Sequence, residues 1–330
     1  MSKTFKAITV EEKKNGEFFQ SIVERNIDHL PKGDLLVRVK YSSLNYKDSL
    51  SYSGNKGVTK IYPHTPGIDA MGIVELSKTK EFNEGDKVIV TGYDLGMNTP
   101  GGFGEYISVP KEWVTLLPDN LGDSESMILG TAGITAGLCV NALLEKHKIK
   151  GEKAVVTGST GGVGCIAVML LAKLGAEVTA ITGKTNSKDF LYSIGAKEVL
   201  LRNNYLNSVK KPMSKGVWDI AVDVAGGGML AGIIASMKYG GTVTCCGLVD
   251  SPSFTSSVFP FILRGINLIG IDSAEISIKE KAVVWHNFAN HWRLDAIQNI
   301  SNNVDMYGMM DEVKKILEGR QVGRVVLKHK

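Results

Sequence analysis

The chain has 330 residues with 43% hydrophobic and 22% charged residues, a formal net charge of +4, and 37 glycines. This composition is typical of a globular protein and excludes an intrinsically disordered chain, a collagen-like repeat and a disulfide scaffold. The length favours two domains.

Neither a signal peptide nor a membrane span is indicated by the apolar residues. Residues 1–10 alternate apolar and polar, and no apolar run approaches the ~18 residues of a spanning helix. The cysteines form no C-x-x-C pair, which is typical of reduced thiols in a cytoplasmic protein; they are Cys139, Cys165, Cys245 and Cys246. The small, dispersed charge gives no reason to expect nucleic acid as a partner, so we expect a small-molecule substrate and no membrane association.

The first third of the chain is predicted to be rich in short strands, at residues 35–41, 72–76 and 87–91. A helix is predicted over 131–146, after a cap-like start at 124–127. From residue 151 the pattern alternates between strand and helix. Strands are predicted at 153–157, 177–182, 198–201, 218–222, 241–246 and 266–271, and helices at 164–174, 187–194 and 229–237.

This alternation predicts an α/β fold in which a doubly wound, parallel six-stranded Rossmann sheet accompanies a β-rich domain. We expect the β-rich domain to comprise residues 1–125 and 298–330, and the Rossmann domain residues 126–297. A last strand at 324–328 is expected to pair with the first domain.

A glycine-rich loop, T-G-S-T-G-G-V-G over residues 157–164, follows a predicted strand and opens a predicted helix. In this context glycines let the backbone approach a pyrophosphate at the helix N-terminus. The alternative is a glycine turn needed only for close packing. The residues predicted to contact the dinucleotide are Gly158, Thr160, Gly161, Gly162, Val163 and Gly164.

The end of the second Rossmann strand indicates which dinucleotide binds. NAD-binding sheets usually place a carboxylate there for the ribose 2′-hydroxyl. Here the strand ends in Thr182, Gly183 and Lys184, and Arg202 follows the third strand. Cations without a carboxylate favour a 2′-phosphate, so NADP(H) is predicted rather than NAD(H). The alternative is that Lys184 is only an exposed loop lysine.

The loop also fits the pattern of short-chain dehydrogenases, but that family has the loop near its N-terminus and a Tyr-x-x-x-Lys pair downstream. Here only Tyr52 and Lys56 match that pair, and they lie upstream, which we interpret as chance.

The layout and several dispersed motifs instead resemble the medium-chain dehydrogenase/reductase superfamily. These motifs are S-L-N-Y-K-D at 43–48, P-G-I-D-A-M-G at 66–72, G-G-F-G-E-Y at 101–106, G-T-A-G-I-T-A at 130–136, and P-F-I-L-R-G at 260–265 with G-I-D-S at 270–273. Within it, the chain resembles the zinc-free YhdH/YhfP group of quinone oxidoreductases, which includes acrylyl-CoA reductases. The resemblance implies a GroES-like catalytic domain and a homodimer.

Zinc-dependent members of that superfamily have a cysteine ligand in the segment matching 44–48 and a histidine where Ile68 stands. Neither ligand is present, and the six histidines are scattered, so no metal site is predicted. Without a Lewis acid, the favoured chemistry is hydride addition from nicotinamide C4 to an activated C=C bond or a quinone, with donors aimed at the developing oxyanion.

The resemblance places three candidate catalytic residues near the nicotinamide. Tyr46 could donate to the oxyanion or contact the cofactor, and Asn45 could fix the ribose or substrate. Asp69 could orient a donor or end a strand. The alternative for Tyr46 is a core aromatic whose hydroxyl meets backbone.

Further cofactor-side residues are implied by the same resemblance. Thr131 and Thr135 could contact the nicotinamide or serve only helix capping and packing. Arg264 could bind an anion or pair with Asp272. The other positions are Gly247, Leu248, Ile262, Ser273 and Arg320, with the stretch 320–324 placed on the cofactor or cleft side.

The leading hypothesis is a zinc-independent NADPH-dependent reductase of an activated C=C bond, with acrylyl-CoA or a similar enoyl thioester or enone as substrate. An NADPH:quinone oxidoreductase is the close alternative. A non-catalytic NADPH-binding redox sensor is the alternative from another class.

Overall fold

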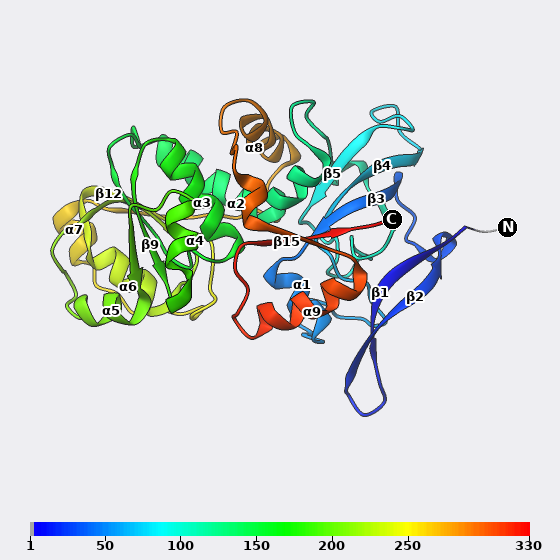
Figure 1. Cartoon of the computed structure of the whole chain (residues 1–330), viewed down its shortest axis with the longest axis horizontal. Helices are drawn as coiled ribbons and strands as arrows, with labels where there is room; N and C mark the ends of the chain where they lie inside the picture. Colours follow the sequence, from blue (N-terminus) through cyan, green and yellow to red (C-terminus); the bar gives the residue numbers. More distant parts are fainter. Residues whose placement is uncertain (1–2) are drawn as a thin grey trace. The chain divides into compact units, whose positions relative to one another are not determined.

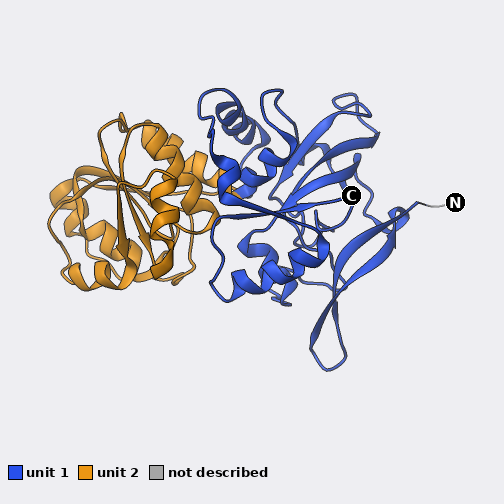
Figure 2. Ribbon diagram, in the orientation of Figure 1, with its two compact units in different colours: residues 1–131, 274–330 blue, residues 132–273 orange. Residues whose placement is uncertain are grey.

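The computed structural model describes residues 3–330, and the chain divides into two compact units. Unit 1 comprises residues 1–131 and 274–330, and unit 2 comprises residues 132–273 (Figure 2). Because unit 1 is made from both ends of the chain, unit 2 is an insertion within it.

Unit 1 is built on a seven-stranded sheet, seen in Figure 1 beside the β1–β2 hairpin. The strand order is β14-β15-β3-β4-β5-β7, and β6 also pairs with β3. The hairpin strands are β1 (Thr4–Glu12) and β2 (Phe18–Asn26). The sheet strands are β3 (Leu35–Ser43), β4 (Asp69–Ser77), β5 (Lys87–Thr91), β6 (Tyr106–Val109), β7 (Val114–Leu116), β14 (Ser301–Val304) and β15 (Arg324–Lys328).

Alternation along β3 explains why this sheet forms. Leu35, Val37 and Val39 are buried, while the residues between them are less so, which is the two-residue period of a strand with one face on a core. The predicted pairing of the last strand is confirmed, since β15 lies antiparallel to β3 with Val326 opposite Ser43.

Unit 2 contains a six-stranded sheet in the order β10-β9-β8-β11-β12-β13, with every neighbouring pair parallel. The strands are β8 (Lys153–Val156), β9 (Glu177–Thr182), β10 (Glu198–Leu201), β11 (Trp218–Asp223), β12 (Met237–Cys245) and β13 (Asn267–Gly270). This is the order of the Rossmann fold, in which ligands bind where the order reverses, here between β8 and β11. The predicted fold class is confirmed.

Helices connect the parallel strands of unit 2 (Figure 1). They are α3 (Gly162–Lys173), α4 (Lys188–Ser193), α5 (Arg202–Ser208), α6 (Gly227–Ala235) and α7 (Phe259–Arg264). Parallel neighbours require such crossovers, and the apolar faces of the helices complete the core.

The helix α2 (Asp123–Leu144) begins eight residues before the predicted start at 131 and is broken at Gly130, which has φ 51° and ψ −152°. By length and composition α2 could cross a membrane, but 72% of its most apolar window is buried within the structure. Its hydropathy is therefore accounted for by the protein core.

The expected second domain boundary, at residue 298, differs from the structure, which assigns residues 274–297 to unit 1. The physical reason is Lys281 of α8 (Ile278–Asn290), which is 1% exposed. Its ammonium donates to the Thr91 carbonyl over 2.7 Å and to the Ala274 carbonyl over 2.9 Å. It also lies 3.4 Å from the centroid of the Tyr93 ring. The contacts with Thr91 and Tyr93 fasten the segment to the end of β5.

Candidate active site

The predicted site residues fall into two groups, one in each unit. Unit 1 holds Asn45, Tyr46, Asp69, Thr131 and Arg320, and unit 2 holds the others.

The glycine-rich loop of unit 2 connects β8 to α3 at the point where the strand order reverses. Gly158 has φ 59°, a conformation that favours glycine. A Cβ on Gly164 would lie 2.3 Å from the Gly158 carbonyl oxygen, so only glycine allows the helix to begin this close to the loop. The Gly161 amide is used within the loop, donating to Gly158 over 2.9 Å. The loop thus has the tight geometry that a pyrophosphate cradle requires.

Two cations lie beside Gly183, which follows β9: Lys184, the next residue in the sequence, and Arg202, the first residue of α5. The half-buried Lys184 ammonium donates to Thr160 Oγ over 3.1 Å, and its backbone amide donates to Thr182 Oγ over 3.0 Å. The Arg202 guanidinium lies 3.3 Å from where a Cβ on Gly183 would be. Burial, and next the Arg202 charge, lower the pKa of Lys184. A dianionic phosphate would relieve the repulsion between these cations, so the residues fit the 2′-phosphate of NADP(H).

Asp69 of unit 1, the first residue of β4, is fully buried and is the centre of a hydrogen-bond network. Its carboxylate accepts from Ser43 Oγ over 2.5 Å and from Asn45 Nδ2 over 2.7 Å. It also accepts from the amide and hydroxyl of Thr131, over 2.9 Å and 2.5 Å. Asp69 therefore begins a strand, rather than ending one, and binds donors from two segments, residues 43–45 and Thr131.

Asn45 precedes α1 (Tyr46–Tyr52) and is bound on three sides. Its side-chain nitrogen donates to Asp69, and its side-chain oxygen accepts from Arg324 over 3.3 Å. Its backbone amide donates to Asp48 over 2.7 Å. The side-chain amide and the backbone amide of Asn45 thus both have partners within unit 1, and a contact with ribose or substrate stays a prediction.

Tyr46 is the first residue of α1 and is 41% exposed. Its phenol is therefore not that of a core aromatic, the alternative considered from the sequence. An exposed hydroxyl next to a rigidly held residue can donate to a ligand at the surface of unit 1.

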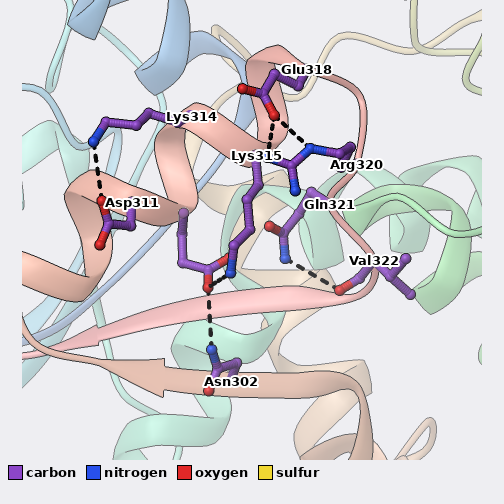
Figure 3. A network of polar contacts seen from close by, with 9 residues as sticks. Asn302, Asp311, Lys314, Lys315, Glu318, Arg320, Gln321 and Val322 are labelled. Carbon is purple, nitrogen blue, oxygen red and sulfur yellow. Dashed lines mark hydrogen bonds and ion pairs between the residues drawn. The ribbon is translucent and has the colours of Figure 1, made fainter.

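Two predicted arginines have other partners. Arg264 neither pairs with Asp272 nor is directed only at a ligand, because its guanidinium donates to the carbonyls of Ala235, Met237 and Ser214. Arg320 pairs with Glu318 just after α9 (Met306–Leu317), among the polar contacts that Figure 3 shows. Both arginines therefore have partners within their own unit, and their contact with the cofactor stays a prediction.

The remaining predicted positions are also located. Thr135 donates to Ser273 over 2.7 Å within unit 2. Leu248 and Ile262 are 59% and 70% exposed. Gly247 is tightly packed, since a Cβ there would lie 2.0 Å from the Val224 carbonyl oxygen.

Two buried carboxyl groups were not singled out from the sequence. Asp48 accepts from the amides of Asn45 and Ile68, and burial, with the Asp69 charge, raises its pKa to about 7. Asp223 ends β11, and burial raises its pKa to about 6. Asp48 is the last residue of the S-L-N-Y-K-D motif at 43–48. Only its place as the third residue of a helix that begins at Tyr46 could have indicated a capping role.

Zinc, which many proteins of this fold bind, does not fit the residues of unit 1. Residues 44–48 contain no cysteine, Ile68 stands where the expected histidine would be, and the part of the chain that the structure describes has no group of three histidine, cysteine or acidic side chains arranged for a metal. No step of the chemistry below is assigned to a metal.

Comparison with known proteins supports this architecture. Residues 31–119 match the family described as alcohol dehydrogenase GroES-like domain, and residues 162–289 match the family described as zinc-binding dehydrogenase. A curated Bacillus subtilis protein, YhfP, whose name proposes a quinone oxidoreductase, is 40% identical over 99% of this chain and 100% of its own length. The chain belongs to the medium-chain dehydrogenase/reductase superfamily.

Other members of this superfamily are similarly close. The acrylyl-CoA reductase AcuI of Ruegeria pomeroyi is 36% identical over 98% of both chains. The crystal structure of the YhdH oxidoreductase from Salmonella enterica in complex with NADP superposes with a TM-score of 0.94, at 35% identity over 98% of this chain and 100% of that one. The structure of B. subtilis YhfP was solved with NAD bound and gives a TM-score of 0.96, at 38% identity over 99% and 100% of the two chains.

Proposed function

We propose that this NADPH-dependent oxidoreductase reduces the activated C=C bond of an enoyl thioester of the acrylyl-CoA type. The observation that carries the proposal is the exposed side chain of Tyr46, the first residue of α1. Hydrogen bonds among Asp69, Asn45 and Asp48 hold the start of this helix. Such a donor suits a reaction in which negative charge develops on a conjugated oxygen.

The cofactor assignment rests on residues of unit 2. Relatives have been solved with either NADP or NAD, so the choice for this chain depends on its own residues. Lys184 and Arg202 flank Gly183 at the end of β9, where an NAD-binding sheet usually places a carboxylate. When bound, NADPH supplies a hydride from C4 of its nicotinamide.

The role assigned to this chain is to stabilise the enolate formed as hydride adds to the β-carbon. The Tyr46 hydroxyl donates a hydrogen bond to the thioester oxygen, which carries the developing charge. Solvent then protonates the α-carbon, giving the saturated thioester. Asn45 and Asp69 contribute by holding the start of α1 in one position.

The experiment is single-turnover reduction with NADPH deuterated at the transferred position of C4. Acrylyl-CoA should yield propionyl-CoA with one deuterium at C3, detected by mass spectrometry, and crotonyl-CoA should react more slowly. Deuterium elsewhere, or no reduction of either thioester, would contradict the proposal.

A quinone is the second candidate substrate, favoured by the name of the B. subtilis relative. A 1,4-benzoquinone assayed under the same conditions separates the two. A kcat/KM for the quinone that exceeds that for acrylyl-CoA by tenfold or more would favour it. NADPH binding without turnover of any of these substrates would instead favour a non-catalytic sensor.

A further inference from the structure

Arg324, the first residue of β15, places a buried guanidinium beside the start of α1. It is 3% exposed and lies in the last strand of the unit 1 sheet. Its Nη1 donates to the Leu44 carbonyl over 3.0 Å and to Asn45 Oδ1 over 3.3 Å. The backbone adds a third link, because the Leu44 amide donates to the Val325 carbonyl over 3.0 Å. Arg324 therefore binds the two residues that immediately precede Tyr46.

The same guanidinium also binds the broken turn of α2. Its Nε donates to the Ile128 carbonyl over 2.7 Å. At Gly130 the helix is interrupted, and a Cβ there would lie 2.4 Å from Asp69 Oδ2 and 3.2 Å from Arg324 Nη2. Arg324 and Asp69 thus approach this turn together and leave no room for a side chain.

The two charged residues hold opposite ends of one amide. Asp69 accepts from Asn45 Nδ2, and Arg324 donates to Asn45 Oδ1. Because the carboxylate can bind only the nitrogen and the guanidinium only the oxygen, the pair allows one of the two flipped orientations of the Asn45 side chain. Together with the bonds to the Leu44 carbonyl and amide, these contacts anchor the backbone from which α1 and its first residue, Tyr46, begin.

We propose that Arg324 is a positioning residue that acts through Asn45 to orient the Tyr46 hydroxyl. The inference rests on the proposed function, in which that hydroxyl contacts the substrate oxygen. Lysine cannot replace Arg324, since its donors radiate from one nitrogen and do not reach the Ile128, Leu44 and Asn45 oxygens in the directions of a planar fork.

The test is a double-mutant cycle on kcat with Arg324→Lys and Tyr46→Phe. Arg324→Lys alone should lower kcat by about 10–100-fold, the usual cost of losing a residue that orients a reactive group, with KM for NADPH within ~3-fold of wild type. In the Tyr46→Phe background the same change should cost less than ~3-fold, because the group it orients is already gone. If the kcat loss of the double variant equals the product of the two single losses, the proposal is wrong.

Two further variants separate positioning from general destabilisation. Asn45→Ser keeps a good helix-capping side chain while removing the amide, so it should reproduce the kcat loss and the non-additivity even if Arg324→Lys does not fold. Arg25→Lys is the matched control, since Arg25 is a half-buried arginine of β2 that donates to Thr65 Oγ, and it should leave kcat unchanged. An Asn45→Ser enzyme with wild-type kcat would overturn the proposal.

A readout without turnover keeps this inference distinct from the proposed function. The side-chain amide protons of Asn45, observed by NMR, should shift in Arg324→Lys and not in Arg25→Lys. If these protons do not respond, the positioning role is wrong. If they respond but wild type reduces no thioester, the substrate proposal alone has failed, and the cycle is repeated with the quinone.

Discussion

The Thr157 hydroxyl donates to Oδ1 of Asp223 over 2.7 Å and so joins the ends of β8 and β11. The same oxygen accepts from the Val224 amide over 2.9 Å and the Ala225 amide over 3.3 Å, while Asp223 Oδ2 accepts from the Gly226 amide over 2.8 Å. One threonine therefore connects the glycine-rich loop to the neighbouring loop where the strand order reverses.

Replacing this threonine tests its role in cofactor binding. Thr157→Val keeps the shape but leaves two amides and the buried carboxylate without their hydroxyl partner, which should cost about 2–3 kcal/mol in the free energy of unfolding. NADPH affinity should fall at least tenfold. Urea denaturation and fluorescence titration measure the two effects. Thr115→Val in β7 is the control, and unchanged affinity in Thr157→Val would contradict the prediction.

The cations at the end of β9 should determine which dinucleotide is preferred. Lys184→Ala and Arg202→Ala should each weaken NADPH binding by about 10–100-fold, corresponding to ~1.5–3 kcal/mol for a charge-assisted contact, and leave NADH binding nearly unchanged. The loss should shrink at high salt. Equal weakening of both dinucleotides would show that these residues do not contact a 2′-phosphate, and Lys188→Ala, an exposed lysine of α4, is the control.

Gly164 should tolerate no side chain. Gly164→Ala places a methyl group 2.3 Å from the Gly158 carbonyl, so the loop must shift, and both NADPH affinity and the melting temperature should fall. Gly228→Ala is the matched control, because its Cβ would meet no atom closer than 4.0 Å, and in helix α6 it should stabilise by up to ~1 kcal/mol. Calorimetry with and without NADPH distinguishes loss of binding from loss of folding.

Asp48 should make the free energy of unfolding depend on pH. Its pKa in the folded chain is about 7, raised from 3.8 by burial and by the Asp69 charge. Between these values the folded chain binds more protons at this group than the unfolded chain does. The contribution of Asp48 to the free energy of unfolding therefore falls as pH rises through this window, by at most ~1.4 kcal/mol per pH unit. Outside the window this contribution is constant.

The corresponding variant is Asp48→Asn, which should flatten the dependence of unfolding free energy on pH between about 4 and 7 relative to wild type. Urea denaturation at several pH values gives the slopes. Asp311→Asn, whose side chain is 72% exposed on α9, controls for the change in net charge. Identical slopes in wild type and Asp48→Asn would refute the shift.

Tyr46→Phe tests the donor itself. Loss of one hydrogen bond to an oxyanion should lower kcat about 100–1000-fold while leaving the melting temperature and NADPH affinity unchanged, because the phenol is 41% exposed. Steady-state reduction of acrylyl-CoA measures kcat, and Tyr307→Phe, 73% exposed on α9, is the control. Full activity of Tyr46→Phe would assign the donor role to another group.

Much of the Rossmann unit could be predicted because its information is local. Buried parallel strands are short apolar runs, and glycine turns mark their ends, so β9 and β10 begin and end where the sequence predicts. The place of Gly183 and Lys184 could be predicted as well, because both follow β9 directly in the sequence.

The polar network of unit 1 could not be predicted because its partners are distant in sequence. Arg324 binds the Leu44 carbonyl across 280 positions, and nothing near either residue indicates the other. The carbonyl partners of Arg264 could not be predicted for a related reason. An arginine between apolar segments needs partners, but the sequence does not reveal that backbone carbonyls at residues 214, 235 and 237 converge on it.

Unit 1 is assembled from two separate segments of the chain, which affects the order in which it can fold during translation. Unit 2 is one continuous segment and can fold as soon as it leaves the ribosome. In unit 1, by contrast, β3 can pair with β15, and Asn45 can bind the Arg324 guanidinium, only after residues 324–328 have been made. Until β15 is made, residues 41–43 of β3 lack their antiparallel partner, and the Asn45 side-chain oxygen lacks the Arg324 guanidinium.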